Sequence, residues 1–480
     1  MIKLITNTLF PFTDFLYILQ MEEYSSKRYL YWFKNFFWRR GIQKRQFLML
    51  TARARIVYIL SVFIFVAMWL AFLSIIIPNY LLLGYCTVAS PAYIAGISIC
   101  TLIFSENLIA VMMLLLSFIY IPYIVLFAHL ITCPFVDIFI KRKIRHAQSV
   151  VAAMEDLRII AIAGSYGKTS VKNYLFQLLQ HTYKTQMISG NINTNLGIAD
   201  WVLTRIHSNT QILIVEMDTY HPGEICLSSS ITPPDISILT NIGDQHLIRF
   251  ASDNDHVRAL AEIFTCAKPA ALCVASTDTW RTIKRLHIQT DERVALCVVD
   301  NDRPYPEVDT SHLSLAQRSN LTLALRVAKH LDVPLRFATD VVQNPLQVDR
   351  RGAISKIYGY EGIDDSYNIS YTTACISIER AYALAKDKQK KLLVVTAGIP
   401  ELSLANHHKN QLLGELLGKV AQFTYVLASI FSDEITKGIG DEGKYMVVEN
   451  LADFVSLAQV NHPTNEYILL VLPELNDLYY

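Results

Sequence analysis

The sequence lacks basic side chains over one long stretch. Of its 480 residues, 43 are lysine or arginine, yet none lies between Ile56 and Ile140, where the only acidic residues are Glu106 and Asp137. About 20 apolar residues in a helix cross a bilayer core of about 30 Å. A soluble core does not stay free of basic residues over such a length. The stretch therefore predicts several membrane-spanning helices.

Three further features are missing or scarce. The formal net charge is only +1, so the composition implies no bulk attraction to nucleic acid, and we expect no nucleic-acid partner. The eight cysteines form no CxxC pair, which predicts small buried side chains in a reducing compartment rather than a disulfide framework or a zinc site. The sequence has no internal repeat and no low-complexity linker. Its length allows about three folded domains.

Two breaks, at Pro78-Asn79 and at Ser105-Glu106-Asn107, divide the apolar stretch into candidate spans. The three candidate spans cover about Ile56–Ile77, Leu81–Phe104 and Leu108–Ile131. Basic residues lie on both flanks, and the positive-inside rule therefore places both flanks in the cytoplasm. That arrangement requires an even number of spans. Either one span is re-entrant, or the region around Ser90-Pro91 is split and gives a fourth.

The segments before the first span are of two kinds. Glu22–Arg55 interleaves lysine and arginine with aromatic residues, and beside a membrane region this mixture favours a helix lying on the anionic cytoplasmic leaflet. Met1–Gln20 is apolar and aromatic but is interrupted by polar residues. It is either a short span or an interfacial helix, and it has no signal-peptide cleavage site.

One stretch carries a phosphate-binding pattern. Ile159–Ile162 is a β-branched run typical of a buried parallel strand, and apolar residues recur at helical spacing from Val171 to Leu179. In the turn between them, backbone N–H groups and the helix N-terminus can face an anion, while a lysine adds positive charge and a threonine hydroxyl reaches Mg²⁺. The turn has the short Gly-x-x-Gly-Lys-Thr form. The residues predicted to bind the nucleotide phosphates are Gly164, Ser165, Gly167, Lys168, Thr169 and Ser170.

From Val150 onward, apolar strands alternate with amphipathic helices, which predicts a doubly wound α/β fold with a parallel sheet. The strands expected in this part are Ile159–Ala163, Gln211–Glu216, Ile236–Thr240, Ala271–Val274 and Val294–Val298. A second, Rossmann-like α/β block begins near Lys390, with strands expected at Lys391–Thr396, Phe423–Leu427 and Tyr467–Val471. We place domain boundaries at 1–149, 150–345 and 346–480.

Three strand ends lead into polar turns. Glu216 ends one strand, where a carboxylate close to a phosphate-binding loop holds Mg²⁺ or is merely capped or salt-bridged. His246 follows another strand and is a metal ligand, a phosphate contact, or a histidine satisfied by ordinary hydrogen bonds. The turn Gly362–Asn368 offers acids for a ribose or a metal and a tyrosine for stacking. Its alternative is an ordinary Asp-rich turn.

These motifs together resemble the Mur ligase family, and within it the MurF branch, which adds D-alanyl-D-alanine to the cell-wall precursor peptide. The resemblance runs from about Ile159 to the C-terminus, and the joint order and spacing of its motifs are specific. The matching pieces are Ala163–Ser170, Gly190–Gly197, Val215–Ile225, Thr240–Leu247, Ser319–Leu321 and Ile363–Asn368.

The resemblance implies an ATP-dependent amide ligase that acts through an acyl phosphate. Lys168 would contact the β- and γ-phosphates, Thr169 and Glu216 would hold one Mg²⁺, and His246 would serve a second. The catalytic set is thus Lys168, Glu216 and His246. On the nucleotide, Asn320 would meet the adenine side, and Asp365 with Arg351, or Arg350 in its place, would meet ribose or phosphate. The residues implied for the substrate are Asn193, Thr194, Asn195, Tyr367 and Asn368.

Three departures from the family pattern bear on function. The family's Asn-x-Asp-Asp near the end of the central domain is replaced by Ala275–Asp278. The family carries a lysine, commonly carbamylated, where this chain has Leu260. A leucine cannot bind metal, which leaves open a slow or inactive enzyme. Membrane spans stand where the family has the domain that grips the uridine diphosphate of the substrate. We therefore expect a peptide-bearing cell-wall precursor that is membrane-linked or handed over at the membrane.

The sequence supports two hypotheses. The first is a multi-pass membrane protein with cytoplasmic MurF-like ligase domains, using ATP and Mg²⁺ in peptidoglycan synthesis. The second is a catalytically impaired, nucleotide-binding membrane scaffold for cell-wall enzymes. Retained Lys168, Thr169, Glu216 and His246 favour the first, whereas Leu260 and Ala275 favour the second. A transport ATPase is disfavoured, because the apolar stretch has no evident set of buried charges.

Overall fold

The chain divides into two units, Met1–Ile140 and Lys141–Leu475, which are described separately. In the computed structural model, the described residues are 12–21, 24–33, 51–88, 121–190, 192–243, 250, 252–288, 295–299, 308, 310, 313, 315–343, 352–366, 370–399, 408–429 and 431–472.

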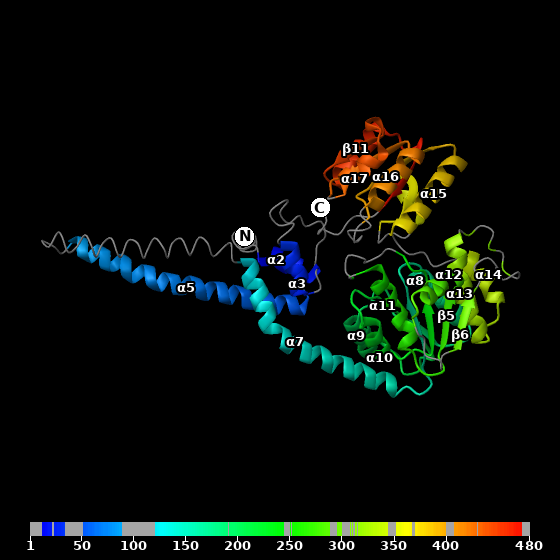
Figure 1. The fold of residues 1–480 in the computed structure, drawn as a ribbon, viewed down its shortest axis with the longest axis horizontal. Helices are drawn as coiled ribbons and strands as arrows, with labels where there is room; N and C mark the ends of the chain where they lie inside the picture. Colours follow the sequence, from blue (N-terminus) through cyan, green and yellow to red (C-terminus); the bar gives the residue numbers. More distant parts are fainter. Residues whose placement is uncertain are drawn as a thin grey trace. The chain divides into compact units, whose positions relative to one another are not determined.

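The described part of the first unit is helical (Figure 1). Its helices are α2 (Phe12–Met21), α3 (Ser26–Trp32), α5 (Ala52–Val88) and the first part of α7 (Ile121–Ala152). Leu16 and Leu19 of α2 are fully buried, and the Tyr29 hydroxyl of α3 donates a 3.0 Å hydrogen bond to the Pro122 carbonyl of α7. On α5, by contrast, Ile59 and Phe63 are 68% and 69% exposed. The described part of α5 therefore presents large apolar side chains on its surface.

Two helices in the described residues are long and apolar enough to cross a bilayer, judged by length and composition alone: Ala52–Ala71 within α5, and Ile121–Ala152. The predicted break at Pro78-Asn79 is wrong, because α5 continues through both residues to Val88. A proline removes one backbone hydrogen bond, and an apolar helix can tolerate that loss without ending. The break at Ser105-Glu106-Asn107 and most of the second and third spans lie outside the described residues, so the number of spans stays a prediction.

Helix α7 extends beyond the predicted end of the third span at Ile131. It contains Pro134 and continues through the basic cluster to Ala152. Within the second unit, Ala147 of this helix is fully buried, and the Gln148 side-chain amide donates a 3.0 Å hydrogen bond to the Ser230 hydroxyl. Lys143 also forms an ion pair with Asp200. The last turns of α7 are therefore packed against the α/β fold that follows.

The second unit begins with a six-stranded parallel sheet of order β2-β3-β1-β4-β5-β6. Its strands are β1 (Arg158–Ala163), β2 (Thr185–Met187), β3 (Ile212–Glu216), β4 (Ile236–Leu239), β5 (Leu272–Ser276) and β6 (Ala295–Val299). In the central register, Ala161 pairs with Val215 on one side and Ser237 on the other. All five strands expected here are present within a residue or two, and the parallel α/β fold is confirmed. The short edge strand β2 was not predicted.

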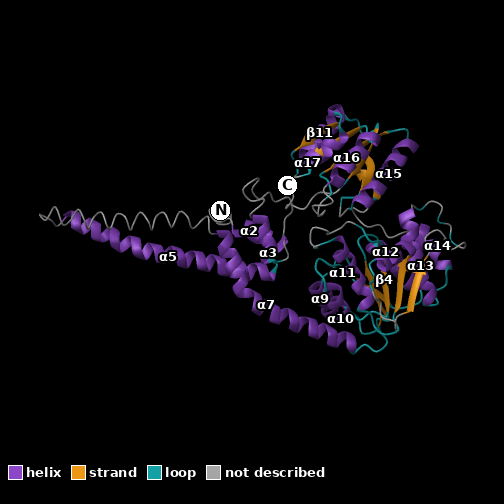
Figure 2. Cartoon of the chain, in the orientation of Figure 1, coloured by secondary structure: helices purple, strands orange, loops and turns teal. Residues whose placement is uncertain are grey.

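Helices cover both faces of this sheet (Figure 2). On one face, α8 (Lys168–Leu179), α13 (Leu315–His330) and α14 (Arg336–Gln343) pack together over Ile160, Ile162, Ile212 and Ile214. The other helices are α9 (Asn195–Arg205), α10 (Glu224–Ile231), α11 (Asp253–Thr265) and α12 (Thr277–Arg285). Of these, α9 and α11 both contact α10, and α11 contacts α12. The central strands β3, β1, β4 and β5 are buried almost throughout, and in such a doubly wound fold ligands bind at the carboxyl ends of the strands.

The second sheet has the order β11-β10-β9-β12-β8-β7 and is parallel except for β7, which runs antiparallel to β8. Its strands are β7 (Ala353–Ile357), β8 (Tyr360–Asp364), β9 (Lys391–Thr396), β10 (Phe423–Leu427), β11 (Tyr445–Val448) and β12 (Tyr467–Val471). Its helices are α15 (Tyr371–Asp387), α16 (His408–Val420), α17 (Ser432–Ile439), the 3₁₀ turn η4 (Glu442–Lys444) and α18 (Leu451–Asn461). The three strands expected in this block, β9, β10 and β12, match their predicted ranges.

The prediction that the cysteines are unpaired is wrong for two of them. Cys226, on α10, and Cys266, at the end of α11, form a disulfide with a Cα–Cα distance of 5.3 Å. The two residues are 40 apart in the sequence and meet only because α10 packs on α11. Cys133, Cys273, Cys297 and Cys375 are free, but only Cys273 is buried as predicted, and the other three are partly exposed.

Candidate functional site

The turn between β1 and α8 has the backbone geometry of a phosphate-binding loop. Gly164 and Gly167 adopt φ values of +139° and +91°, and Gly167 directly precedes the first residue of α8. A Cβ on Gly164 would lie 2.1 Å from the Thr240 hydroxyl oxygen, and one on Gly167 would lie 2.4 Å from Asn320 Oδ1. Both positions therefore require glycine, because φ is positive and a neighbouring side chain fills the space.

Lys168 and Thr169 begin α8 and are both 6% exposed. The Lys168 ammonium donates to the Gly164 carbonyl at 2.5 Å, which folds the side chain back over the turn. The Thr169 hydroxyl donates a 3.0 Å hydrogen bond to Oε2 of Glu216, the last residue of β3. The structure thus brings together residues predicted from two separate motifs: Lys168 and Thr169 of the phosphate loop, and Glu216 at a strand end.

Lys172 is a fourth member of this cluster that sequence reasoning missed. Its side chain is 2% exposed, and its ammonium lies 3.0 Å from Glu216 Oε2. It also donates to the carbonyls of Ile188 and Gly190 at 3.2 and 3.0 Å. These three contacts match the three donors of an ammonium, which is how the charge is satisfied without water. The sequence does contain a signal for this residue: Lys172 follows Lys168 by four residues, which places both lysines on the same face of the predicted helix.

Asp218 is a second residue that was missed. It lies two residues beyond Glu216, and its Oδ2 is 3.3 Å from the Lys168 ammonium. The same oxygen accepts a 3.2 Å hydrogen bond from the Asn193 side-chain amide. Asn193 was predicted to line the acceptor cleft, so Asp218 joins that loop to the phosphate-binding lysine.

The other two residues predicted for the cleft have structural contacts. Thr194 caps α9 by accepting from the Gly197 N–H at 3.3 Å. The Asn195 side-chain oxygen accepts a 2.5 Å hydrogen bond from the Ser228 hydroxyl of α10. These bonds fix where the loop enters α9.

The segment after β4 supports the phosphate loop from its other side. The Ser165 N–H donates to the Asn241 carbonyl at 2.8 Å, and the Thr240 hydroxyl donates to the Tyr166 carbonyl at 2.8 Å. The Gly243 N–H donates to the Ser165 hydroxyl at 2.9 Å, so Ser165 is engaged within the protein. His246 lies outside the described residues, and its predicted metal role stays a prediction.

Asn320 of α13 packs against Gly167 and is 6% exposed. Its Oδ1 has no hydrogen-bond partner among the described residues. A buried acceptor without a partner is costly, and a donor on a bound nucleotide would satisfy it. The predicted contact with the adenine side stays a prediction.

Leu260 is 1% exposed on α11, so the chain keeps an apolar side chain where the resemblance expects lysine. Two residues later, Glu262 accepts hydrogen bonds from the Gly223 and Cys226 N–H groups at 2.6 and 3.3 Å. Burial raises the pKa of Glu262, and these backbone bonds oppose that rise. Glu262 therefore holds the first turn of α10.

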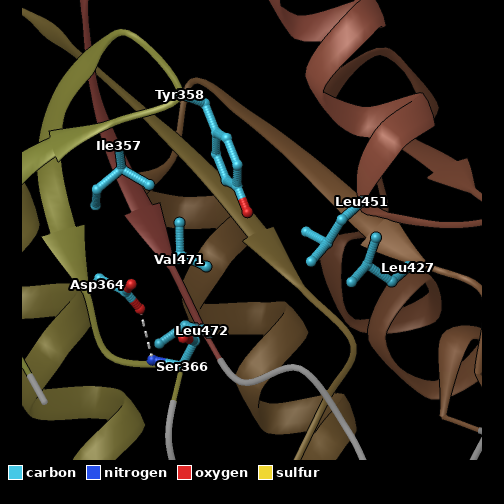
Figure 3. A pocket seen from close by; sticks show the side chains of 8 residues that line it. All are labelled: Ile357, Tyr358, Asp364, Ser366, Leu427, Leu451, Val471 and Leu472. Atoms are coloured by element: carbon cyan, nitrogen blue, oxygen red, sulfur yellow. Dashed lines mark hydrogen bonds between the residues drawn. The ribbon is translucent and has the colours of Figure 1, made fainter. Parts of the chain in front are cut away.

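The predicted turn Gly362–Asn368 is shorter than expected, because Gly362–Asp364 belongs to β8. The Asp365 carboxylate accepts a hydrogen bond from the Ser377 hydroxyl of α15. Figure 3 shows a small hollow beside this strand end, where Asp364 accepts the Ser366 N–H at 3.0 Å and Tyr358 extends its ring across the space. Arg350, Arg351, Tyr367 and Asn368 lie outside the described residues, so their predicted roles are not tested.

The residues around the phosphate loop fit ATP and Mg²⁺. Hydroxyl and carboxylate oxygens, as in the pair Thr169 and Glu216, are the hard donors that Mg²⁺ prefers. Within the described residues, no three His, Cys, Asp or Glu side chains are placed to hold a metal ion by themselves.

Comparison with known proteins identifies the first sheet. Residues 162–315 match the Mur ligase middle domain. This part of the chain is similar to the Mur ligase middle domain. The matched residues include the phosphate loop, Glu216, Asp218 and the described part of the segment after β4.

Several curated relatives share one name. UDP-N-acetylmuramoyl-tripeptide–D-alanyl-D-alanine ligase of Buchnera aphidicola is 34% identical over 122 residues, which cover 25% of this chain and 27% of that protein. The enzymes of that name from Bacillus subtilis and Escherichia coli are 34% and 30% identical over 111 and 121 residues. These matches cover 23% and 25% of this chain, and 24% and 26% of the relatives. The chain thus spans about a quarter of the length of these relatives.

Solved structures share the fold over a greater length. MurF ligase from Thermotoga maritima, in complex with ADP, is similar with a TM-score of 0.59 at 20% identity, covering 70% of this chain and 80% of that one. MurF from Acinetobacter baumannii gives a TM-score of 0.57 at 20% identity, covering 68% and 75%. A pseudomurein peptide ligase type C from Methanothermus fervidus gives 0.51 at 14% identity, covering 67% and 76%. Each likeness covers about two thirds of this chain, more than the residues 162–315 that match the middle domain.

Proposed function

We propose that this protein is an ATP-dependent amide ligase of the MurF type that acts on a peptide-bearing cell-wall precursor. One observation carries the proposal: Thr169 and Glu216 are in contact beside Lys168, at the carboxyl ends of two parallel strands. This is the place and the donor set for a magnesium nucleotide. The names of the relatives and the ADP-bound MurF neighbour support the same reading.

In the proposed reaction, ATP phosphorylates a peptide carboxylate, and an amine attacks the acyl phosphate to give the amide, ADP and phosphate. Lys168 holds the β- and γ-phosphates and neutralises charge on the group being transferred. Thr169 and Glu216 hold Mg²⁺, which would neutralise further phosphate charge. The loop Ile192–Asn195 positions the acceptor, so that the two substrates react within one site.

Lys172 has a supporting role in this reaction. Its ammonium is 3.0 Å from Glu216 and also binds the Ile188 and Gly190 carbonyls. It therefore holds the metal-binding carboxylate in one orientation and fixes the start of the acceptor loop.

We further propose that the ligase is anchored in a membrane with its α/β domains in the cytoplasm. The support is the length and apolar composition of two helices, the exposed apolar face of α5 and the basic residues that follow the apolar stretch. An enzyme held at the membrane would meet a lipid-linked precursor directly. The lipid link is a proposal about the substrate.

The alternative, an impaired scaffold, rests on Leu260 and Ala275, which stand where the family pattern has other residues. An assay of phosphate release separates the two. Purified protein in detergent receives Mg-ATP, D-alanyl-D-alanine and either the nucleotide-linked or the polyprenyl-linked precursor peptide. The ligase proposal predicts phosphate release that needs both the peptide and the dipeptide, and the membrane proposal predicts faster release with the lipid-linked peptide. ATP binding without such release would favour the scaffold, and use of the soluble peptide alone would contradict the lipid link.

A further inference from the structure

Asp218 lies partly buried and in contact with both the phosphate loop and the segment before α9. Its side chain is 9% exposed and that of Lys168 is 7% exposed. Oδ2 of Asp218 serves both Lys168, at 3.3 Å, and the Asn193 amide, at 3.2 Å, while Oδ1 accepts the Thr219 N–H at 3.0 Å. The Asp218 N–H also donates to the Asn193 carbonyl at 3.2 Å. Asn193 is thus tied to Asp218 through its side chain and its main chain.

We propose that Asp218 is a positioning residue that transmits occupation of the phosphate site to the loop Ile192–Asn195. The inference rests on the proposed function, because that function assigns the loop to the acceptor substrate. It concerns a residue that acts through Lys168 and Asn193, without contact to the reacting atoms.

The physical argument is competition for one cation. A bound phosphate and Asp218 are both anions, and both are drawn to the Lys168 ammonium. As the lysine turns toward phosphate, a carboxylate that is 9% exposed loses part of its charge compensation. Hydrogen bonds to a charged acceptor are stronger than those to a neutral one, so the hydrogen bond from the Asn193 amide to Asp218 contributes more to stabilising that carboxylate. The loop is then held more firmly when nucleotide is bound.

The rest of the loop is placed to pass this change on. Its beginning is fixed by Lys172, which binds the Ile188 and Gly190 carbonyls. Its end is Thr194, which caps α9 through the Gly197 N–H. Asn193 lies between these two fixed ends and is joined to the phosphate site through Asp218. When Asn193 becomes less mobile, the neighbouring loop residues assigned to the acceptor substrate become less mobile too.

Hydrogen exchange followed by mass spectrometry tests this on the full-length protein in detergent, with and without Mg-ATP. The variant Asp218→Asn keeps an acceptor for the Asn193 amide but removes the charge that binds Lys168. The matched control is Asp235→Asn. Asp235 pairs with Lys268 at 2.9 Å and accepts the Ile159 N–H at 2.8 Å, but it lies at the amino end of β4, away from the site.

In the wild type and in Asp235→Asn, we expect Mg-ATP to slow hydrogen exchange at residues 192–198 and at the Asp218 amide by about 5-fold or more, which is the lower end of ordinary coupling between two sites. In Asp218→Asn, we expect Mg-ATP to slow the same exchange by less than about 2-fold. Asp218→Asn should keep or improve its affinity for ATP, since Lys168 is released from its internal partner. If Asp218 had only a structural role, Asp218→Asn would weaken ATP binding, but saturating Mg-ATP would still slow exchange in residues 192–198 as much as in the wild type.

A second variant keeps the test decisive should Asp218→Asn fold poorly. Asn193→Ala leaves the Lys168–Asp218 pair in place, and we expect it to retain protection of residues 164–170 by Mg-ATP while losing the loop response. Equal loop responses in wild type, Asp218→Asn and Asn193→Ala would overturn this inference, as would protection of 164–170 in the wild type with no change in the loop. Absence of any ATP binding by the wild type would instead overturn the proposed function.

Discussion

Replacing Lys172 by methionine isolates the buried ion pair that organises the site. Lys172 and Glu216 are 2% and 3% exposed with their charged atoms 3.0 Å apart. Methionine fills much of the same volume but leaves Glu216 charged and two carbonyls without their donor. Removing one partner of a buried pair costs about 3–5 kcal/mol. For a domain of about 150–250 residues, each kcal/mol shifts Tm by about 2–4 °C, so the expected loss is about 6–20 °C.

The assay is thermal unfolding of the full-length protein, read from intrinsic fluorescence. Lys268→Met is the matched control: it removes a lysine from a 2.9 Å ion pair with Asp235, but the two side chains are 38% and 34% exposed. Exposed pairs contribute less than about 1 kcal/mol, so the control should shift Tm by less than about 4 °C. The double variant Lys172→Met, Glu216→Gln removes the uncompensated charge and should recover part of the loss. Equal shifts for Lys172→Met and Lys268→Met would refute the reasoning.

Three other substitutions give direct tests. Thr169→Val removes the hydroxyl that contacts Glu216 at 3.0 Å, and the gain in ATP affinity on adding Mg²⁺, measured by titration calorimetry, should shrink; an undiminished gain would exclude Thr169 from the metal site. Gly167→Ala combines a φ of +91° with a contact of 2.4 Å to Asn320, so we expect a loss of about 1–3 kcal/mol in thermal unfolding and weaker ATP binding, and wild-type values for both would contradict the described turn. Burial raises the pKa of Glu262 above its ordinary 4.5, so the folded state binds this proton more tightly than the unfolded state. The contribution of Glu262 to the free energy of unfolding is therefore fully present below pH 4.5 and is lost as pH rises through the pKa of the folded state. Glu262→Gln should flatten this part of a plot of Tm against pH. An unchanged slope would refute a raised pKa for Glu262.

The sequence was informative where local pattern and fold agree. Buried β-branched runs identified β1, β3 and β4, because strands covered on both faces read as continuous apolar segments. The missed strand β2 is only Thr185–Met187, and its residues are half-buried and mixed in polarity. Strands β7 and β8 contain lysine, glutamate and glycine, so their sequence does not distinguish them from a polar loop.

For the candidate site, the motifs gave residues but not their contacts. Lys168, Thr169 and Glu216 could be assigned from the phosphate loop and a strand end. Asp218 could not, since its partners are Lys168 and Asn193, each at least 25 residues away in the sequence. The disulfide was missed for the same reason: its cysteines are 40 residues apart and meet through the packing of two helices. At Pro78 the sequence predicted a helix end that the structure does not have, because the apolar helix α5 continues through the proline.

The central claim is that the turn between β1 and α8 binds the phosphates of ATP with Mg²⁺. Titration calorimetry of the purified full-length protein with ATP, in the presence of Mg²⁺ and then of a chelator, tests it most directly. The account predicts saturable binding of one ATP per chain that weakens when Mg²⁺ is removed and is lost in Lys168→Ala. Absence of binding, or binding unaffected by both Mg²⁺ and the Lys168 substitution, would contradict it.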